Sequence, residues 1–271
     1  MQANSTVVKK TARAALKDNF VKSIFFCLTV VFSMLAVYII EALLCIVFPD
    51  AVAGVIIALL LIFLIAPLVL GMLRAFWRIM WNSDDTIEVV FYYFSSKEEY
   101  ERSLRLIFGI VLRTLWIGFL LFLPSLFTDA LSSVRVYEFF GMSAPSFASN
   151  LWVLSAFLKI AAGIVLYTIM LKYYLAPFLF VADEQMDAAE AIHKSTLLSR
   201  ATAIDFLLLT FSFFGWFLIS LTVIPVIFTI PYFVMSYVVH SRFAVANYNK
   251  VAKQFSSRED DFQFSAESIE L

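Results

Sequence analysis

The sequence predicts an all-α integral membrane protein: a polytopic helical bundle with about six transmembrane helices and short amphipathic helices on the membrane surface. Of its 271 residues, 62% are hydrophobic and 15% are charged. Soluble domains are about half apolar and about one quarter charged, so this composition indicates lipid as the main solvent. The apolar residues also occur in long runs, and a helix needs about 20 of them to cross a hydrocarbon core of about 30 Å.

Composition also argues against several classes of function. The net charge of −1 gives no general attraction to nucleic acid. Cys27 and Cys45 both lie in the first apolar run, and the two histidines stand far apart, so neither residue type has metal-ligand spacing. The motifs GxxxxGK[ST], HExxH and CxxC do not occur. We therefore expect no enzymatic activity, no cofactor and no metal.

The N-terminal 20 residues are expected to form a basic helix on the cytoplasmic surface, near residues 5–18. The candidate contacts of this helix with lipid at the inner surface are Lys9, Lys10, Arg13 and Lys17. The apolar run from Val21 to Phe48 is longer than the apolar region of a signal peptide, which has about 7–15 residues, so it is predicted to be the first span. Pro49 and Asp50 end this run, and the second span follows from about residue 51 to 80.

The connection after the second span contains signals for a short helix. Asp85-x-x-Glu88 and Ser96-x-x-Glu99 both have the spacing of a capping box, in which side chains satisfy free amides at a helix start. Apolar residues recur between them at helical spacing, at Ile87, Val90, Phe91 and Phe94. This pattern predicts a helix over about 86–95 that lies on the membrane surface.

The second half of the chain is predicted to hold the remaining spans. Spans three and four cover about residues 106–127 and 151–176, and Pro177 is expected to bend or end the fourth. Asp187-x-x-Glu190 predicts a surface helix over 187–199, and Thr202-x-x-Asp205 predicts a cap at the start of span five. The apolar stretch 203–240 would be about 57 Å long as one helix, so it fits two spans that meet near residues 222–225. One span followed by a re-entrant segment remains the alternative.

The distribution of positive charge predicts the orientation. With the N-terminus inside, nearly all lysine and arginine residues outside the spans fall on the cytoplasmic side, and Arg135 is the one basic residue in the outer connections. This asymmetry follows the positive-inside rule. The expected organisation is therefore a cytoplasmic N-terminal helix over 1–20, a six-span membrane domain over 21–248 and a cytoplasmic, partly disordered tail over 249–271.

Four ionisable residues within the predicted spans form a candidate intramembrane polar site: Glu41, Arg113, Lys159 and Lys172. Such residues are costly in lipid and often mark ligand or ion pathways. Arg113 and Lys172 are close enough to the cytoplasmic face for their side chains to reach the interface. Glu41 and Lys159 fall in the outer half of their spans, where they could reach headgroups separately or pair with each other. Interface contact, structural pairing and an ion or ligand path all remain open.

Several short motifs resemble a family of bacterial membrane proteins catalogued as domain of unknown function 975. The resemblance rests on Lys9-Lys10-x-Ala12-Arg13-x-x-Leu16-Lys17-x-Asn19, Phe94 with Tyr100-x-x-Ser103-Leu104, Leu115-Trp116, the stretch from Tyr173-Tyr174 through Asp183 to Ser195, Phe213-x-Gly215-Trp216 and Pro231-Tyr232. The family has Asn-Pro where this chain has Glu184-Gln185. The resemblance implies a bacterial plasma-membrane protein with no established activity. A weaker likeness to the membrane domain that precedes some glycerophosphodiester phosphodiesterases suggests work associated with lipid.

These observations lead to two functional hypotheses. The first is a non-enzymatic accessory protein that binds lipid, in particular anionic lipid, or a membrane-protein partner through its basic and aromatic elements at the inner surface. The alternative is a transporter or permease-like component that uses the intramembrane charges together with the prolines in and beside the spans. A lipid-modifying enzyme is a third and weaker hypothesis, because no polar cluster at an interface can be assembled from the sequence.

Overall fold

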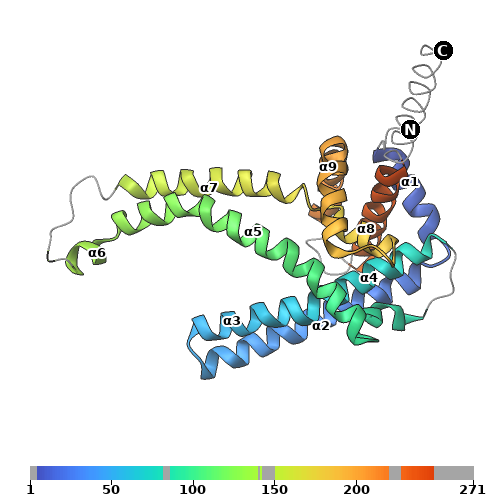
Figure 1. Cartoon of the computed structure of the whole chain (residues 1–271), viewed down its shortest axis with the longest axis horizontal. Coiled ribbons are helices and arrows are strands. Elements are labelled where there is room, and N and C mark those ends of the chain that lie inside the picture. The colour runs from blue at the N-terminus through green and yellow to red at the C-terminus, as the bar shows by residue number, and fades with distance from the viewer. Residues whose placement is uncertain (1–4, 82–85, 140, 142–149, 220–226, 247–271) are drawn as a thin grey trace, which may run out of the picture.

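The computed structural model describes residues 5–81, 86–139, 141, 150–219 and 227–246, and the regular elements within them are helices (Figure 1). Five of these helical segments are long and apolar enough to cross a membrane: Phe20–Val47, Asp50–Ile79, Lys97–Ser132, Leu151–Met170 and Ala188–Trp216. The predicted all-α membrane fold is therefore confirmed. The predicted tail over 249–271 lies outside the described residues.

Two long helical hairpins extend from a common base (Figure 1). In the first hairpin, α2 (Phe20–Val47) is followed by α3 (Asp50–Leu60), η1 (Leu61–Ile65) and α4 (Ala66–Ile79). In the second hairpin, α5 (Lys97–Ser132) leads through α6 (Val134–Phe139) to α7 (Leu151–Met170). Large apolar side chains along both hairpins are exposed, as expected for surfaces in contact with lipid.

The base contains the shorter elements and the core. It includes α1 (Ser5–Leu16), η2 (Ile87–Phe94), α8 (Ala176–Ala182), α9 (Ala188–Phe211) and a helix over 227–246, with α10 (Phe214–Ile219) following α9. One apolar cluster joins α1, α2, α4 and helix 227–246 around Phe76 and Met235. A second joins α4, η2, α5, α8 and α9 around Tyr93 and Phe180. The base is therefore the part of the described chain where protein packs most extensively against protein.

A wider helical turn marks the middle of the predicted second span. The π-helical segment η1 ends two residues before Pro67. Proline has no amide hydrogen, and in a regular α-helix its ring would clash with the carbonyl four residues earlier, here that of Phe63. The Tyr100 hydroxyl donates a hydrogen bond of 3.0 Å to this carbonyl. The second hairpin thus supplies a partner to the backbone group that proline disturbs in the first.

The predicted surface helix over 86–95 differs from the structure in its period and its environment. Residues 87–94 form a 3-10 helix, in which side chains three residues apart share one face. Val90 and Tyr93 are therefore buried together in the base, whereas Ile87 and Phe91 of the predicted stripe are exposed. The predicted helix is therefore present with one side packed against protein, and its position at the membrane surface stays a prediction. Asp85 of the predicted capping box lies outside the described residues.

Other helix starts agree with the sequence in part. Ser96 caps α5 and accepts a hydrogen bond of 3.2 Å from the Glu99 amide, as the capping box predicts. Asp187 caps α9 by accepting a hydrogen bond from the Ala189 amide. Thr202 is not a cap: its hydroxyl donates to the Leu198 carbonyl inside α9. The predicted break between a surface helix over 187–199 and span five is therefore wrong, because residues 188–211 contain no glycine or proline to interrupt one continuous helix.

The ends of the last predicted spans also differ from expectation. Helix α7 ends at Met170, earlier than the predicted residue 176, and Pro177 lies in the first turn of α8. Proline is well placed there because the first amides of a helix have no intrahelical partner. The predicted sixth span is helical over 227–246. The meeting point predicted at 222–225 lies outside the described residues.

Candidate functional site

Helix α1 is the amphipathic N-terminal helix that the sequence predicts, but its apolar face covers protein. Val8, Ala12 and Leu16 recur every four residues and therefore lie on one side of the helix. All three are buried in the cluster that includes α2, α4 and helix 227–246. The packing fixes where the basic side chains of α1 point.

The four candidate lipid contacts on α1 have different surroundings. Lys10, Arg13 and Lys17 are exposed, whereas Lys9 is half-buried. The Lys9 ammonium donates a hydrogen bond of 2.8 Å to the Ser212 carbonyl and lies 4.3 Å from the centre of the Phe213 ring. Burial, and secondarily the charge of Arg13, lower the pKa of Lys9. Lys9 therefore ties α1 to the end of α9, and the other three cations remain accessible.

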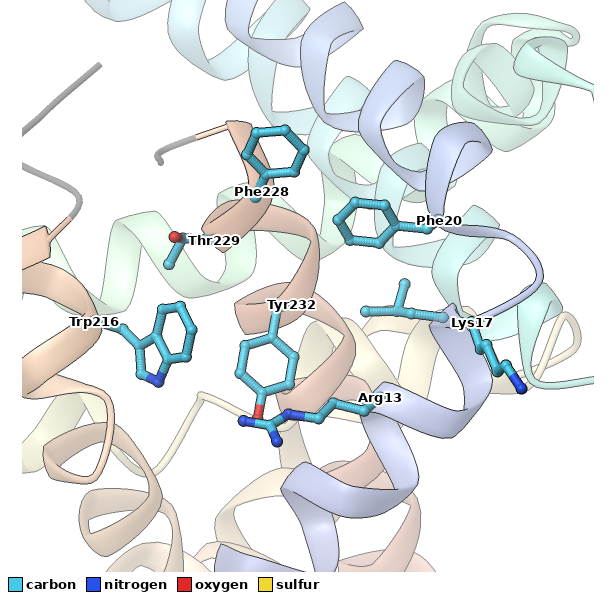
Figure 2. Close-up of a pocket in the computed structure, with 8 residues that line it drawn as sticks. Arg13, Lys17, Phe20, Trp216, Phe228, Thr229 and Tyr232 are labelled. Atoms are coloured by element: carbon cyan, nitrogen blue, oxygen red, sulfur yellow. The ribbon is translucent and has the colours of Figure 1, made fainter. Parts of the chain in front are cut away.

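A cavity of about 420 Å³ opens between α1, the start of α2, α10 and the start of helix 227–246 (Figure 2). Its lining is mainly apolar and aromatic, with two cations at the edge: Arg13, Leu16, Lys17, Phe20, Trp216, Phe228, Thr229 and Tyr232. The Phe20 and Phe228 rings are stacked with centroids 6.0 Å apart. We call this cavity the aromatic pocket.

Polar groups in the aromatic pocket are few and lie close together. The Arg13 guanidinium carbon is 5.3 Å from the centre of the Tyr232 ring, and Figure 2 shows the guanidinium beside the tyrosine hydroxyl. That hydroxyl is buried and has no hydrogen-bond partner among the described residues. Lys17 borders the pocket, although its ammonium points away from the rings in Figure 2. The arrangement offers one cation and one hydroxyl donor beside apolar walls, which suits an anionic group attached to an apolar chain.

The four candidate intramembrane residues are divided between the two hairpins and the segment after α7. Glu41 lies on α2 in the first hairpin, whereas Arg113 and Lys159 lie on α5 and α7 in the second. Lys172 follows α7, where its side chain is exposed and its carbonyl accepts a hydrogen bond of 2.8 Å from Ser195. The suggested Glu41–Lys159 pair does not form, because Lys159 pairs with a carboxylate on the helix beside it.

That carboxylate belongs to Asp129, near the end of α5. The Lys159 ammonium is 2.6 Å from Asp129 Oδ2. The buried Ser155 hydroxyl is hydrogen-bonded to Asp129 as well, and it lies 3.3 Å from the Ser125 carbonyl. Asp129, Ser155 and Lys159 therefore join α5 to α7 within a hairpin whose surface is otherwise mainly apolar. The sequence gives no signal for this pairing, because it depends on how the two helices align.

Reversing the charges of this pair tests its contribution to folding. Asp129→Lys alone places two cations together, so we expect a lower melting temperature in detergent. Combining it with Lys159→Asp restores opposite charges and should recover part of the loss. The control combines Glu41→Lys with Lys159→Asp. Its melting temperature should not rise above that of Lys159→Asp alone, because Glu41 lies in the other hairpin. Equal melting temperatures for the two double variants would contradict the pairing.

A second polar cluster, around Arg74 and Arg102, lies at the base, and no motif in the sequence predicts it. Arg74 is 5% exposed, forms an ion pair with Glu184 and has its guanidinium carbon 3.5 Å from the centre of the Tyr92 ring. Arg102 donates to the carbonyls of Asp183 and Met186 at 3.1 and 2.7 Å. These contacts tie α4, η2, α5 and the connection between α8 and α9 together. We call this group the arginine cluster.

Tyr93, next to Tyr92, is buried in the same region. Burial raises the pKa of Tyr93, against the opposing influence of the Arg74 and Arg102 charges. The Tyr93 ring is stacked on Phe180, with centroids 5.9 Å apart, and Arg102 lies 4.5 Å from the Phe180 ring centre. The arginine cluster is thus closely packed, and its contacts between elements point to a role in holding the base together.

Comparison with known proteins adds no further constraint: no family model, no curated protein and no solved structure matches this chain. The resemblance to domain of unknown function 975 therefore stays a prediction.

Proposed function

We propose that this chain is a non-enzymatic membrane protein that binds an anionic phospholipid in the aromatic pocket. Arg13 would contact the phosphate, and the rings of Phe20, Phe228 and Trp216 would line the path of an acyl chain. The observation that carries the proposal is the cationic Arg13 beside the buried Tyr232 hydroxyl, which has no hydrogen-bond partner within the described part of the chain, at the edge of an aromatic cavity.

The chemistry of the pocket favours an amphiphile over a small polar ligand. An arginine forms strong, charge-assisted hydrogen bonds with a phosphate, and the Tyr232 hydroxyl can donate another. The apolar lining would give a free phosphate no further contact, but it would bury part of an acyl chain. A volume of about 420 Å³ accommodates a headgroup and the first part of a chain, and the rest of the lipid would remain in the bilayer.

The same considerations favour binding over transport. A transport path needs polar groups that face one another along a route across the membrane. Of the four candidates, Glu41 lies in the first hairpin, whereas Lys159 in the second pairs with Asp129 on the neighbouring helix. We also propose that the protein resides in a bacterial plasma membrane with both termini in the cytoplasm. The charge distribution in the sequence supports this orientation, and inner leaflets are rich in anionic lipid.

Native mass spectrometry of protein released from nanodiscs that contain anionic and zwitterionic phospholipids tests the lipid proposal. We expect the wild-type protein to retain anionic lipid. Arg13→Gln should weaken retention about fivefold, since one cation near a membrane surface contributes about 1 kcal/mol. Lys10→Gln is the matched control, because it removes the same charge from an exposed position on α1 outside the pocket.

Two outcomes would contradict the proposal. Equal lipid retention by the Arg13 and Lys10 variants would show that the pocket does not hold the headgroup. Displacement of the lipid by inorganic phosphate at an equal concentration would show that the aromatic walls contribute nothing and that the site binds free phosphate.

A further inference from the structure

The two ends of helix 227–246 both contact the same end of the first hairpin. Near its start, the Phe228 ring is stacked on Phe20, the first residue of α2. Near its end, the Arg242 guanidinium lies 4.7 Å from the ring centre of Trp81, which comes just after α4. Because α2 and α4 are antiparallel arms of one hairpin, Phe20 and Trp81 lie at the same end of it. A helix that crossed the membrane beside the hairpin would meet this end only once.

Helix α9 has the same property. Its first turn follows Met186, whose carbonyl is bound by Arg102 in the second turn of α5. Its other end is followed by Ser212, whose carbonyl accepts the hydrogen bond from Lys9 in the helix that precedes α2. Both ends of α9 therefore lie at the base. Figure 1 shows α9 running steeply across the direction of α7.

Helices α9 and 227–246 pack against each other as an antiparallel pair. The Phe206 ring lies 5.3 Å from the Tyr237 ring, and Phe213 lies 4.5 Å from Phe233, so the two chains run in opposite directions. Helix α9 also carries charged side chains along most of its length, at Glu190, Lys194, Arg200 and Asp205. Such a distribution is costly for a helix surrounded by lipid and normal for one at the interface.

We infer that α1, α9 and helix 227–246 form a layer that lies along one membrane surface, on the side of the N-terminal helix, instead of adding two further crossings. We call it the basal layer, and its partner is the headgroup region of that leaflet. The aromatic pocket lies within this layer, between α1 and the start of helix 227–246. Resting on the proposed function, the inference assigns the bound anionic phospholipid to the leaflet on the N-terminal side.

Cysteine labelling in sealed vesicles tests the placement of the basal layer. Cys27 and Cys45 are first replaced by serine, and a single cysteine is then introduced by Gly215→Cys. Gly215 in α10 is exposed, and a Cβ atom there would have no neighbour within 4 Å. Lys10→Cys on α1 marks the N-terminal side, and Asp50→Cys marks the opposite side at the turn between α2 and α3.

A membrane-impermeant maleimide should label Gly215→Cys and Lys10→Cys from the same side, and Asp50→Cys from the other side. Labelling of Gly215→Cys from the Asp50 side, or from neither side until detergent is added, would overturn the basal layer. This readout does not depend on lipid retention. If Gly215→Cys is not labelled from the N-terminal side but lipid binding still depends on Arg13, this inference alone is refuted. If Gly215→Cys is labelled from that side but the Arg13 and Lys10 variants retain lipid equally, the proposed function alone is refuted.

Discussion

Replacing Arg74 by alanine is expected to lower the stability of the protein by about 3 kcal/mol, because the substitution removes a nearly buried side chain and leaves a cavity. Arg74 is the centre of the arginine cluster: it is 5% exposed, lies over the Tyr92 ring and pairs with Glu184. Its loss removes a contact between α4 and η2 together with one between α4 and the connection that leads to α9. Melting in detergent, followed by size-exclusion chromatography, measures the effect.

A second variant separates the ion pair from the packing. Glu184→Gln removes the negative partner but leaves Arg74 stacked on Tyr92. The Glu184 side chain is 65% exposed, so water can partly replace the lost pairing, and we expect a loss of only about 1 kcal/mol. Arg105→Ala is the control, because Arg105 is an exposed arginine on α5, and its removal should change the melting temperature little. If Arg74→Ala is as stable as this control, the arginine cluster does not hold the base together.

The parts of the fold that could be predicted are those set by local sequence. The two hairpins follow from apolar runs of sufficient length separated by Pro49–Asp50 and by the polar segment after α5. The start of α5 follows from Ser96 and Glu99, whose interaction spans three residues. Such features depend on the chain's immediate neighbours, so a single sequence contains the information needed to predict them.

The candidate site depended on information that the sequence does not contain. The stripe of Val8, Ala12 and Leu16 predicts an amphipathic helix, but lipid and a protein core are both apolar, so the stripe does not reveal which one it contacts. The aromatic pocket joins residues about 200 positions apart, because Arg13 and Tyr232 meet only after the base has assembled. Local patterns therefore identified Arg13 as a candidate without showing its surroundings.

The misplaced boundary near residue 200 has a different cause. Polarity changes there, from the charged stretch 187–200 to the apolar residues that follow, and such a change predicts the end of one helix and the start of another. Glycine and proline are the residues that most strongly interrupt a helix, and α9 contains neither. The change in polarity instead marks a change in what surrounds a continuous helix. Thr202 illustrates this, because its hydroxyl bonds to the Tyr174 hydroxyl at 2.7 Å while remaining inside α9.

Gly71→Ala is expected to disrupt the base as strongly as the loss of Arg74. Gly71 lies on the buried face of α4, where η2 crosses it, and an added Cβ atom would lie 1.9 Å from the Val90 carbonyl oxygen and 2.7 Å from its carbon. These are backbone atoms, so no side-chain rotation can relieve the clash, and η2 must move away from α4. The cost should reach the upper part of the range for overpacked cores, about 3 kcal/mol.

The matched control is Gly163→Ala in α7, where an added Cβ atom has no neighbour within 4 Å. Alanine favours a helix over glycine by about 1 kcal/mol, so this variant should melt at the same temperature as the wild type or higher. Because η2 also carries Tyr92, its displacement by Gly71→Ala removes the ring on which Arg74 stacks. Gly71→Ala and Arg74→Ala should therefore combine to less than the sum of their separate effects. Full additivity, or a Gly71→Ala protein as stable as Gly163→Ala, would show that η2 does not depend on its close contact with α4.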